Sequence, residues 1–341
     1  MRRRLRFLVG LGLGVTGLAI YLSLIGAEQA LGRVLSVTRL VLLTVLLLVV
    51  LEGVVDGLGV WASVRQLNGG VSPLSAVRLA LAGDFFDILS PAGPVSSEPM
   101  VAVATRRLTE TSYTEVLGAR TVAVYTKATA QVFVSSALGL LILTGQPRGG
   151  RVLSLFLVLS VGSILLVWLL ARFWSSLRAG AIAIGRALGR AIPFEGGRRA
   201  RDRLPEEPLS GFEGRARALG RAPRLVVLIG IGGLLEQCLT ATALYVALAG
   251  IGEPVSLAVL VVLVPFPQVA AVVPVPAGIG AHETLMAGAV SLVAGVAIVP
   301  ATAAVLVLRT LSIPFGLSVG GLSAALLPGW SAFAGDAQPE R

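Results

Sequence analysis

The sequence predicts an all-α polytopic membrane protein, with about six to eight transmembrane helices and two re-entrant motifs arranged as an inverted repeat. The 341 residues are 55% hydrophobic and only 13% charged, whereas soluble domains carry about 25% charged residues. Several uncharged stretches reach the ~20 residues that cross a bilayer core. A motif, Pro-Ala-Gly-x4-Glu, occurs twice. We expect residues 1–341 to form one integral membrane domain.

The first half of the chain contains four predicted spans. The basic residues before Phe7 place the N-terminus in the cytoplasm by the positive-inside rule. The first apolar run resembles a signal peptide, but its 19 residues exceed the usual h-region of about 7–15 residues, so we expect an uncleaved helix. Mixed apolar and polar residues, 72–119, separate the second span from the third. The spans are Phe7–Ile25, Leu40–Trp61, Thr121–Thr144 and Val152–Phe173.

A basic loop, residues 174–224, follows these spans and holds eleven Arg against five acidic residues. Its middle, Glu195–Gly214, is rich in Pro, Gly and charge, which predicts a mobile linker. The loop is predicted to be cytoplasmic, where it determines topology and attracts anionic lipid headgroups. The net charge of +10 does not indicate nucleic-acid binding, because the Arg residues cluster between apolar segments without interleaved aromatics.

The second half begins with a fifth span, Leu225–Gly250, and ends with an apolar helix, Ala301–Leu327. Residues 255–300 are apolar but interrupted by several Pro and Gly residues. They form either two full spans or one re-entrant hairpin. Both alternatives cross the membrane an even number of times, so the C-terminus is predicted to be cytoplasmic. The protein is predicted to be multi-pass in the plasma membrane.

The two copies of the motif are interpreted as an internal duplication. The first runs from Pro91 to Glu98 and the second from Pro276 to Glu283, and an Arg-Thr pair follows each copy. The first repeat core is residues 72–145 and the second is residues 255–327. Three predicted spans lie between the copies, an odd number, so the copies approach the membrane from opposite sides. This is the inverted repeat of many transporters.

The residue types in the motif suit the wall of a polar cavity. Pro and Gly break helices, and irregular backbone within a membrane is tolerated only in protein or along a wet cavity. A helix that begins after the motif directs its positive end to that cavity. We expect each Glu either to pair with an Arg or only to cap its helix, and each Arg either to pair or to extend to the headgroups. The predicted cavity residues are Pro91, Gly93, Glu98, Arg120, Glu236, Pro276, Gly278, Gly280, Glu283 and Arg309.

Other polar residues leave their roles open. Glu52 and Asp56 share a helical face and lie either at the cytoplasmic interface or in the cavity. Asp84 and Asp87 line either an entrance or the interface. His282 lies beside Glu283, but without a nucleophile or second base it does not indicate an enzyme. One Cys and one His provide no metal cluster, and no G-x4-G-K-[ST] motif is present, so we expect no cofactor.

The residues from Asp84 to Gly93, those from Val275 to Glu283, and the Leu-Arg-Thr at 308–310 together resemble the transmembrane region of lysylphosphatidylglycerol synthases. That family includes stand-alone membrane proteins. The resemblance implies a lipid flippase domain. The soluble domain that synthesises the aminoacylated lipid is not expected here, because the chain stops after the last helix, so aminoacyl transfer is not assigned. Related domains accompany glycosyltransferases that use polyprenyl-linked sugars.

The sequence therefore favours a flippase that carries a polar-headgroup lipid, whether phospholipid, aminoacylated or polyprenyl-linked, with membrane lipids as its partners. A second hypothesis is a non-transporting membrane anchor for a separate lipid-modifying or glycosyl transferase, with residues 174–224 as the docking surface. A third is a transporter of ions or small solutes.

Overall fold

The structure is a computed structural model that describes residues 15–16, 18–24, 26–90, 97–143, 206–267 and 275–327, with isolated residues between 150 and 165. These residues form helices and connecting turns without a strand, which confirms the all-α fold. The predictions for Pro91 and Gly93, and most of those for residues 152–205, lie outside this part of the chain. The elements are α2 (Ala27–Leu35), α3 (Arg39–Val64), α4 (Pro73–Leu89), α5 (Ser97–Thr109), α6 (Tyr113–Leu143), α9 (Glu206–Gly220), α10 (Pro223–Gly250), α11 (Leu257–Leu263), the short helix η3 (Pro276–Gly278), α12 (Ala281–Ala294), α13 (Ile298–Phe315), the π-helical turn η4 (Gly316–Gly320) and α14 (Gly321–Ala325).

Four of the described helical segments are long and apolar enough to cross a membrane, which confirms a multi-pass membrane protein. A fifth qualifies if Leu18–Leu24 and Ala27–Leu35 are counted as one bent span. The predicted third span lies within α6, which begins earlier than expected, at Tyr113. The four segments are Arg39–Val64, Pro223–Gly250, Pro276–Ala294 and Ile298–Ala325.

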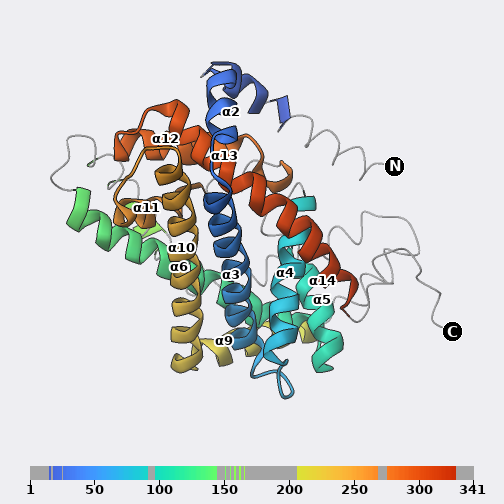
Figure 1. The fold of residues 1–341 in the computed structure, drawn as a ribbon. Coiled ribbons are helices and arrows are strands. Elements are labelled where there is room, and N and C mark those ends of the chain that lie inside the picture. The colour runs from blue at the N-terminus through green and yellow to red at the C-terminus, as the bar shows by residue number, and fades with distance from the viewer. Residues whose placement is uncertain are drawn as a thin grey trace, which may run out of the picture.

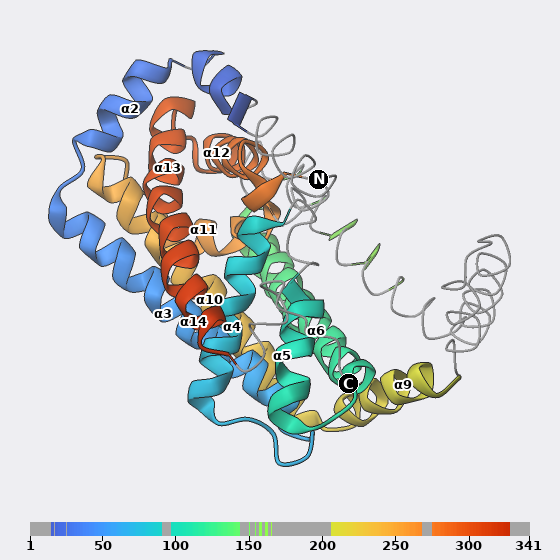
Figure 2. The same ribbon diagram turned by 90° about the vertical axis from the view of Figure 1, so that its right-hand side faces the viewer.

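Helices α3 and α10 form an antiparallel pair that runs side by side through the length of the bundle (Figures 1 and 2). Gly250 at the end of α10 packs against Val41 near the start of α3, and Gly232 near the start of α10 lies beside Gly59. We call the end of the bundle where α3 begins the upper side, and the end where α3 finishes, at Val64, the lower side, as in Figure 1.

Helix α4 lies between two helices that each present a pair of glycines to it. Gly53 and Gly57 of α3 are spaced four residues apart, as are Gly316 and Gly320 of η4. A Cβ on Gly320 would lie 2.4 Å from the carbonyl oxygen of Leu81 on α4. Such small-residue pairs let membrane helices approach to backbone contact, so α4 is held tightly on both sides.

The first repeat core begins with a broken hairpin that opens to the lower side. The α3–α4 contacts run antiparallel, because Gly53 faces Leu81 and Gly57 faces Val77, so α4 enters from the lower side. Helix α5 returns, and α6 then starts at the lower side, where Arg215 contacts both Glu115 and the Gln66 carbonyl.

The second repeat core begins with a broken hairpin that opens to the upper side. Helix α11 starts just after α10 ends there, and its Val261 carbonyl accepts a hydrogen bond from Gln237, midway along α10. Helix α13 descends to the lower side, since Gly316 faces Ile88 and Leu327 joins the cluster around Val60. Helix α12, joined to α13 by a short turn, therefore ends at the upper side.

The two hairpins thus enter from opposite sides, as the inverted repeat predicted. Among the described parts of residues 255–300, the segment Pro276–Ala294 is long and apolar enough to cross a membrane. Seven residues give α11 a length of about 10 Å, which is below the ~30 Å hydrocarbon core. The choice between two full spans and one re-entrant hairpin stays a prediction.

The basic loop differs from the prediction over residues 206–214, which belong to α9 and not to a linker. Helix α9 packs on the lower end of α6, and its Leu219 is buried among apolar side chains of α3, α6 and α10. A Cβ on Gly118 of α6 would lie 2.3 Å from the Phe212 carbonyl oxygen. This packing, which the local composition does not reveal, stabilises the helix.

Burial and hydrogen bonds act in opposite directions on Glu115, where α9 meets α6. Burial raises the pKa of the Glu115 carboxyl, but hydrogen bonds from Ser112 and Arg215 outweigh it and leave the pKa below its ordinary value. Arg215 Nε donates to Glu115 at 3.0 Å. The α9 contact therefore includes an ion pair outside the membrane-spanning segments.

Candidate functional site

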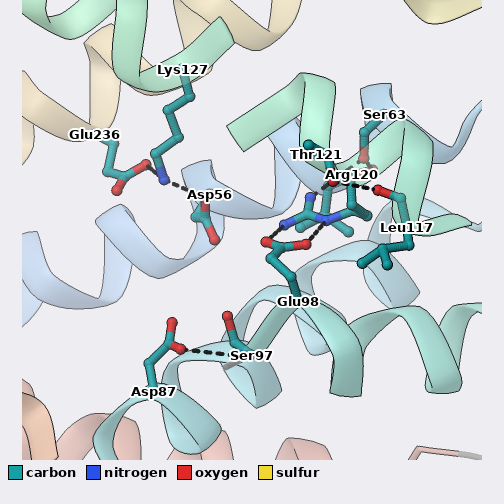
Figure 3. Close-up of polar contacts among 11 residues, drawn as sticks. Asp56, Ser63, Asp87, Ser97, Glu98, Leu117, Arg120, Thr121, Lys127 and Glu236 are labelled. Atoms are coloured by element: carbon teal, nitrogen blue, oxygen red, sulfur yellow. Dashed lines mark hydrogen bonds and ion pairs between the residues drawn. The ribbon is translucent and has the colours of Figure 1, made fainter. Parts of the chain in front are cut away.

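The glutamate of the first motif pairs with the arginine that follows it (Figure 3). Glu98 lies in the first turn of α5 and Arg120 lies on α6. The guanidinium binds both carboxylate oxygens, with Nε to Oε2 at 2.8 Å and Nη2 to Oε1 at 2.6 Å. Its Nη1 also donates to Ser63 at 3.4 Å. Arg120 is 7% exposed, so it does not extend to the headgroups.

The second motif forms the same kind of pair. Arg309 Nε on α13 donates to Glu283 Oε1 at 2.8 Å, and the other carboxylate oxygen accepts from the Gly280 N–H at 2.6 Å. Arg309 also donates to the Ala277 carbonyl, across the tip of the motif. Ala277 has φ 56°, and Gly278 and Gly280 also have positive φ. Glu283, which is 2% exposed, therefore both caps α12 and binds Arg309.

The two pairs give the duplication a structural basis. In each half, a glutamate in the first turn of a helix after the motif binds an arginine on the next long helix. A bidentate or charge-assisted arginine contact fixes orientation as well as charge. The expected Glu–Arg pairing is correct for both copies.

A second ionic cluster lies where α3, α6 and α10 cross (Figure 3). Lys127 Nζ on α6 lies 2.8 Å from Asp56 Oδ1 on α3 and forms an ion pair with Glu236 Oε2 on α10. Thr240 donates to Glu52 Oε1 at 2.7 Å. Glu52 and Asp56 therefore belong to the helix crossing and line the cavity described below, which favours the cavity alternative.

Sequence reasoning did not place Lys127 in the site. The available signal was its position seven residues after Arg120 on the same helix, which puts both side chains on one face. An ionisable residue within a membrane helix faces the bundle interior and has a partner.

The acidic residues of α4 join the same region. Asp87 Oδ1 accepts from the Ser97 backbone N–H at 3.1 Å, which ties the end of α4 to the start of α5 (Figure 3). Asp84 lies one turn earlier on α4. Both line the cavity described next, which favours the alternative that placed them at a polar entrance.

One cavity of about 590 Å³ is lined by most of these charged groups. It is lined by both repeat cores, namely by α4, α5 and α6 of the first and by the motif, α12 and α13 of the second, and also by α3 and α10. Its charged and polar lining residues are Glu52, Asp56, Asp84, Asp87, Ser97, Glu98, Arg120, Lys127, Gln131, Glu236, Thr240, His282, Arg309 and Ser312.

The predicted cavity residues divide into three groups. Glu98, Arg120, Glu236, Gly278 and Arg309 line the cavity. Three others are not among its lining residues but shape the second motif: Pro276 begins η3, Gly280 donates to Glu283, and Glu283 holds Arg309. The remaining two, Pro91 and Gly93, lie outside the described residues.

The cavity carries more negative than positive charge. Six carboxylates line it against two arginines and one lysine. Among the described residues, no group of three or more His, Cys, Asp or Glu side chains is placed to hold a metal ion. The arrangement suits binding and passage of a polar group, since the charges are fixed by pairing on separate helices.

Comparison with known proteins agrees with this architecture. The family model described as the lysylphosphatidylglycerol synthase TM region matches residues 7–320, and no curated protein compared with the chain matches it. The match includes both motifs, both Glu–Arg pairs and the helices that surround the cavity. The chain therefore belongs to the family of the lysylphosphatidylglycerol synthase transmembrane region.

Proposed function

We propose that this protein is a lipid flippase, which moves a lipid with a polar headgroup across the plasma membrane. The observation that carries the proposal is a single cavity lined by both inverted halves of a membrane domain. A polar headgroup that crosses a bilayer must exchange water for protein contacts. The charged lining supplies such contacts, and the exposed apolar side chains of the helices leave the acyl chains in lipid.

The family supports a membrane role associated with lipids, and the substrate classes remain those named from the sequence: phospholipid, aminoacylated lipid or polyprenyl-linked lipid. We further propose that the protein is a carrier and not an enzyme, and that it needs no cofactor.

The distribution of arginine supports a cytoplasmic lower side, with both termini in the cytoplasm. Exposed arginines gather there, at the ends of α3, α5 and α9 and at the starts of α4 and α10. They are Arg65, Arg78, Arg106, Arg107, Arg217, Arg221 and Arg224.

Reconstitution tests this function. Purified protein in liposomes is supplied with a fluorescent lipid, and loss of fluorescence to an impermeant quencher reports the lipid that reaches the outer leaflet. We expect wild-type protein to expose inner-leaflet lipid. The Glu283→Gln and Arg309→Ala variants are expected to fall to the rate of protein-free liposomes.

Arg33→Ala is the matched control, because Arg33 forms a half-exposed pair with Glu253 outside the cavity. Equal rates for Arg309→Ala and wild type would contradict the site assignment. Wild-type rates equal to protein-free liposomes, across phospholipid, aminoacylated and polyprenyl probes, would contradict the function and favour the membrane anchor. Flux of a small solute that is independent of headgroup would favour the third hypothesis.

A further inference from the structure

The cluster around Lys127 differs from the two Glu–Arg pairs in its chemistry. Lys127 is the only lysine in the sequence, and its ammonium sits between Asp56 of α3 and Glu236 of α10. Each arginine of the cavity has a glutamate from its own repeat. Lys127 instead joins a carboxylate of α3 to a carboxylate of α10. These two helices lie outside both repeat cores and run antiparallel.

The surroundings of the cluster contain an excess of carboxylates. Glu52 of α3 and Asp84 of α4 lie within electrostatic range of the Asp56–Glu236 pair. Asp87 of α4 and Arg120 of α6 also line the same cavity, and Arg120 is bound to Glu98. Lys127 is thus the only cation in contact with this carboxylate pair among the described residues.

The two carboxylates are both ion-paired to the Lys127 ammonium. Two carboxylates close together in a membrane interior repel unless a cation or a proton relieves them, and removal of a buried counter-charge is strongly destabilising. Lysine is a compact point charge on a flexible stem, whereas arginine is a planar fork. The side chain that lies between Asp56 and Glu236 is therefore a lysine, which resembles a small free cation more closely than an arginine does.

We propose that Asp56 and Glu236 form a binding site for a monovalent cation, and that Lys127 fills it from within the chain. The ammonium replaces a coupling ion such as Na⁺. Transport by this protein therefore needs no such ion from solution. The last point rests on the proposed flippase function, whereas the site itself does not.

Removal of the tethered cation tests the site. In the Lys127→Met variant, the purified protein in detergent is heated in 150 mM NaCl, or in N-methyl-D-glucamine chloride of the same ionic strength (a concentration of roughly physiological salt). We expect a Tm loss on the order of 5–15 °C in N-methyl-D-glucamine, and recovery of at least about half of it in Na⁺. The wild-type Tm should be the same in both salts.

Two further variants separate a cation site from general destabilisation. Arg33→Met removes a half-exposed pair with Glu253, and its Tm should not distinguish the two salts. Adding Asp56→Asn and Glu236→Gln to Lys127→Met removes the charges that need a cation. This triple variant should recover stability without Na⁺, because neutral replacement of a whole buried ion cluster is tolerated better than loss of one member.

Each result has a defined meaning. A Na⁺-specific rise in Tm for Lys127→Met, absent in the triple variant, supports the site. Equal Tm values for Lys127→Met in the two salts overturn it, as does a triple variant that remains as unstable as Lys127→Met. Recovery of Lys127→Met by acid in N-methyl-D-glucamine, with no response to Na⁺, also overturns it, because a proton then suffices.

The liposome assay tests the consequence for transport. Wild-type flipping should be equal in Na⁺ and N-methyl-D-glucamine, and flipping by Lys127→Met should require Na⁺. If neither protein moves lipid, the flippase function fails, while the Tm series still decides the cation site. If wild-type flipping itself requires Na⁺, the inference that Lys127 replaces the coupling ion is wrong.

Discussion

The Glu283–Arg309 pair allows a quantitative test of the second motif. Glu283 is 2% exposed and the Arg309 side chain is 16% exposed, with Nε 2.8 Å from Oε1. Breaking a buried pair by removing one partner costs about 3–5 kcal/mol, because the other charge is left unpaired. We therefore expect Glu283→Gln and Arg309→Met each to lower the free energy of unfolding by roughly that amount.

The double variant is the decisive measurement. Once one charged side chain of the pair has been replaced, replacing the other leaves no charge without a partner. The two losses of unfolding free energy should therefore not add, and the coupling energy should exceed about 1 kcal/mol. Unfolding in mixed micelles, followed by tryptophan fluorescence as denaturing detergent is added, measures the four proteins of the cycle. The half-exposed Arg33–Glu253 pair, at 3.7 Å, provides a second cycle with an expected coupling of about 0–1 kcal/mol.

Additive effects at Glu283 and Arg309, within about 0.5 kcal/mol, would refute the reasoning. The charges would then be stabilised separately, Glu283 by the α12 N-terminus and Arg309 by the Ala277 carbonyl. The flipping rates of the same variants show whether the pair matters for transport beyond stability.

Three further outcomes follow from the packing. Gly118→Ala should release α9 and cost about 1–3 kcal/mol, seen as faster proteolysis within α9, whereas Gly214→Ala, with nothing within 4 Å, should not. The lowered pKa of Glu115 contributes stability that is present above its ordinary pKa of 4.5 and lost as pH falls through the lower folded value. The protection of α9 amides from hydrogen exchange, taken relative to the intrinsic rate at each pH, should therefore fall in acid, and Glu115→Gln should abolish this dependence. Gly320→Ala should lower Tm, while Gly59→Ala, also with nothing within 4 Å, should leave it nearly unchanged.

The sequence predicts much of this fold because the membrane limits the alternatives. Apolar length predicts α3, α10 and the descending helix that begins at Ile298, and the odd number of spans between the motifs predicts the opposed hairpins. Periodicity does not predict that α4 and α5 form a hairpin. Helix α4 is held by contact with glycine faces on distant segments, and α5 is held by the pair between Glu98 and Arg120; no local pattern contains either contact.

The site was predictable where a motif repeats and less so elsewhere. Glu98 and Glu283 could be matched to Arg120 and Arg309 because offset and order recur in both halves. Lys127 has no counterpart in the second repeat core, so comparison of the halves does not find it. Its role depends on the crossing of three helices, and crossing positions are set by packing.

The glycines that flank α4 allow the position of this helix to be predicted from the sequences of relatives. At Gly320 and Gly57, an added Cβ would meet backbone atoms of α4 at 2.4 Å and 2.8 Å, so a side chain there forces the helix outward. Relatives can therefore be sorted without a structure or a substrate. Relatives with glycine at both positions can place α4 as close to α3 and η4 as it lies here. In relatives with larger residues at these positions, α4 must lie farther from those two segments.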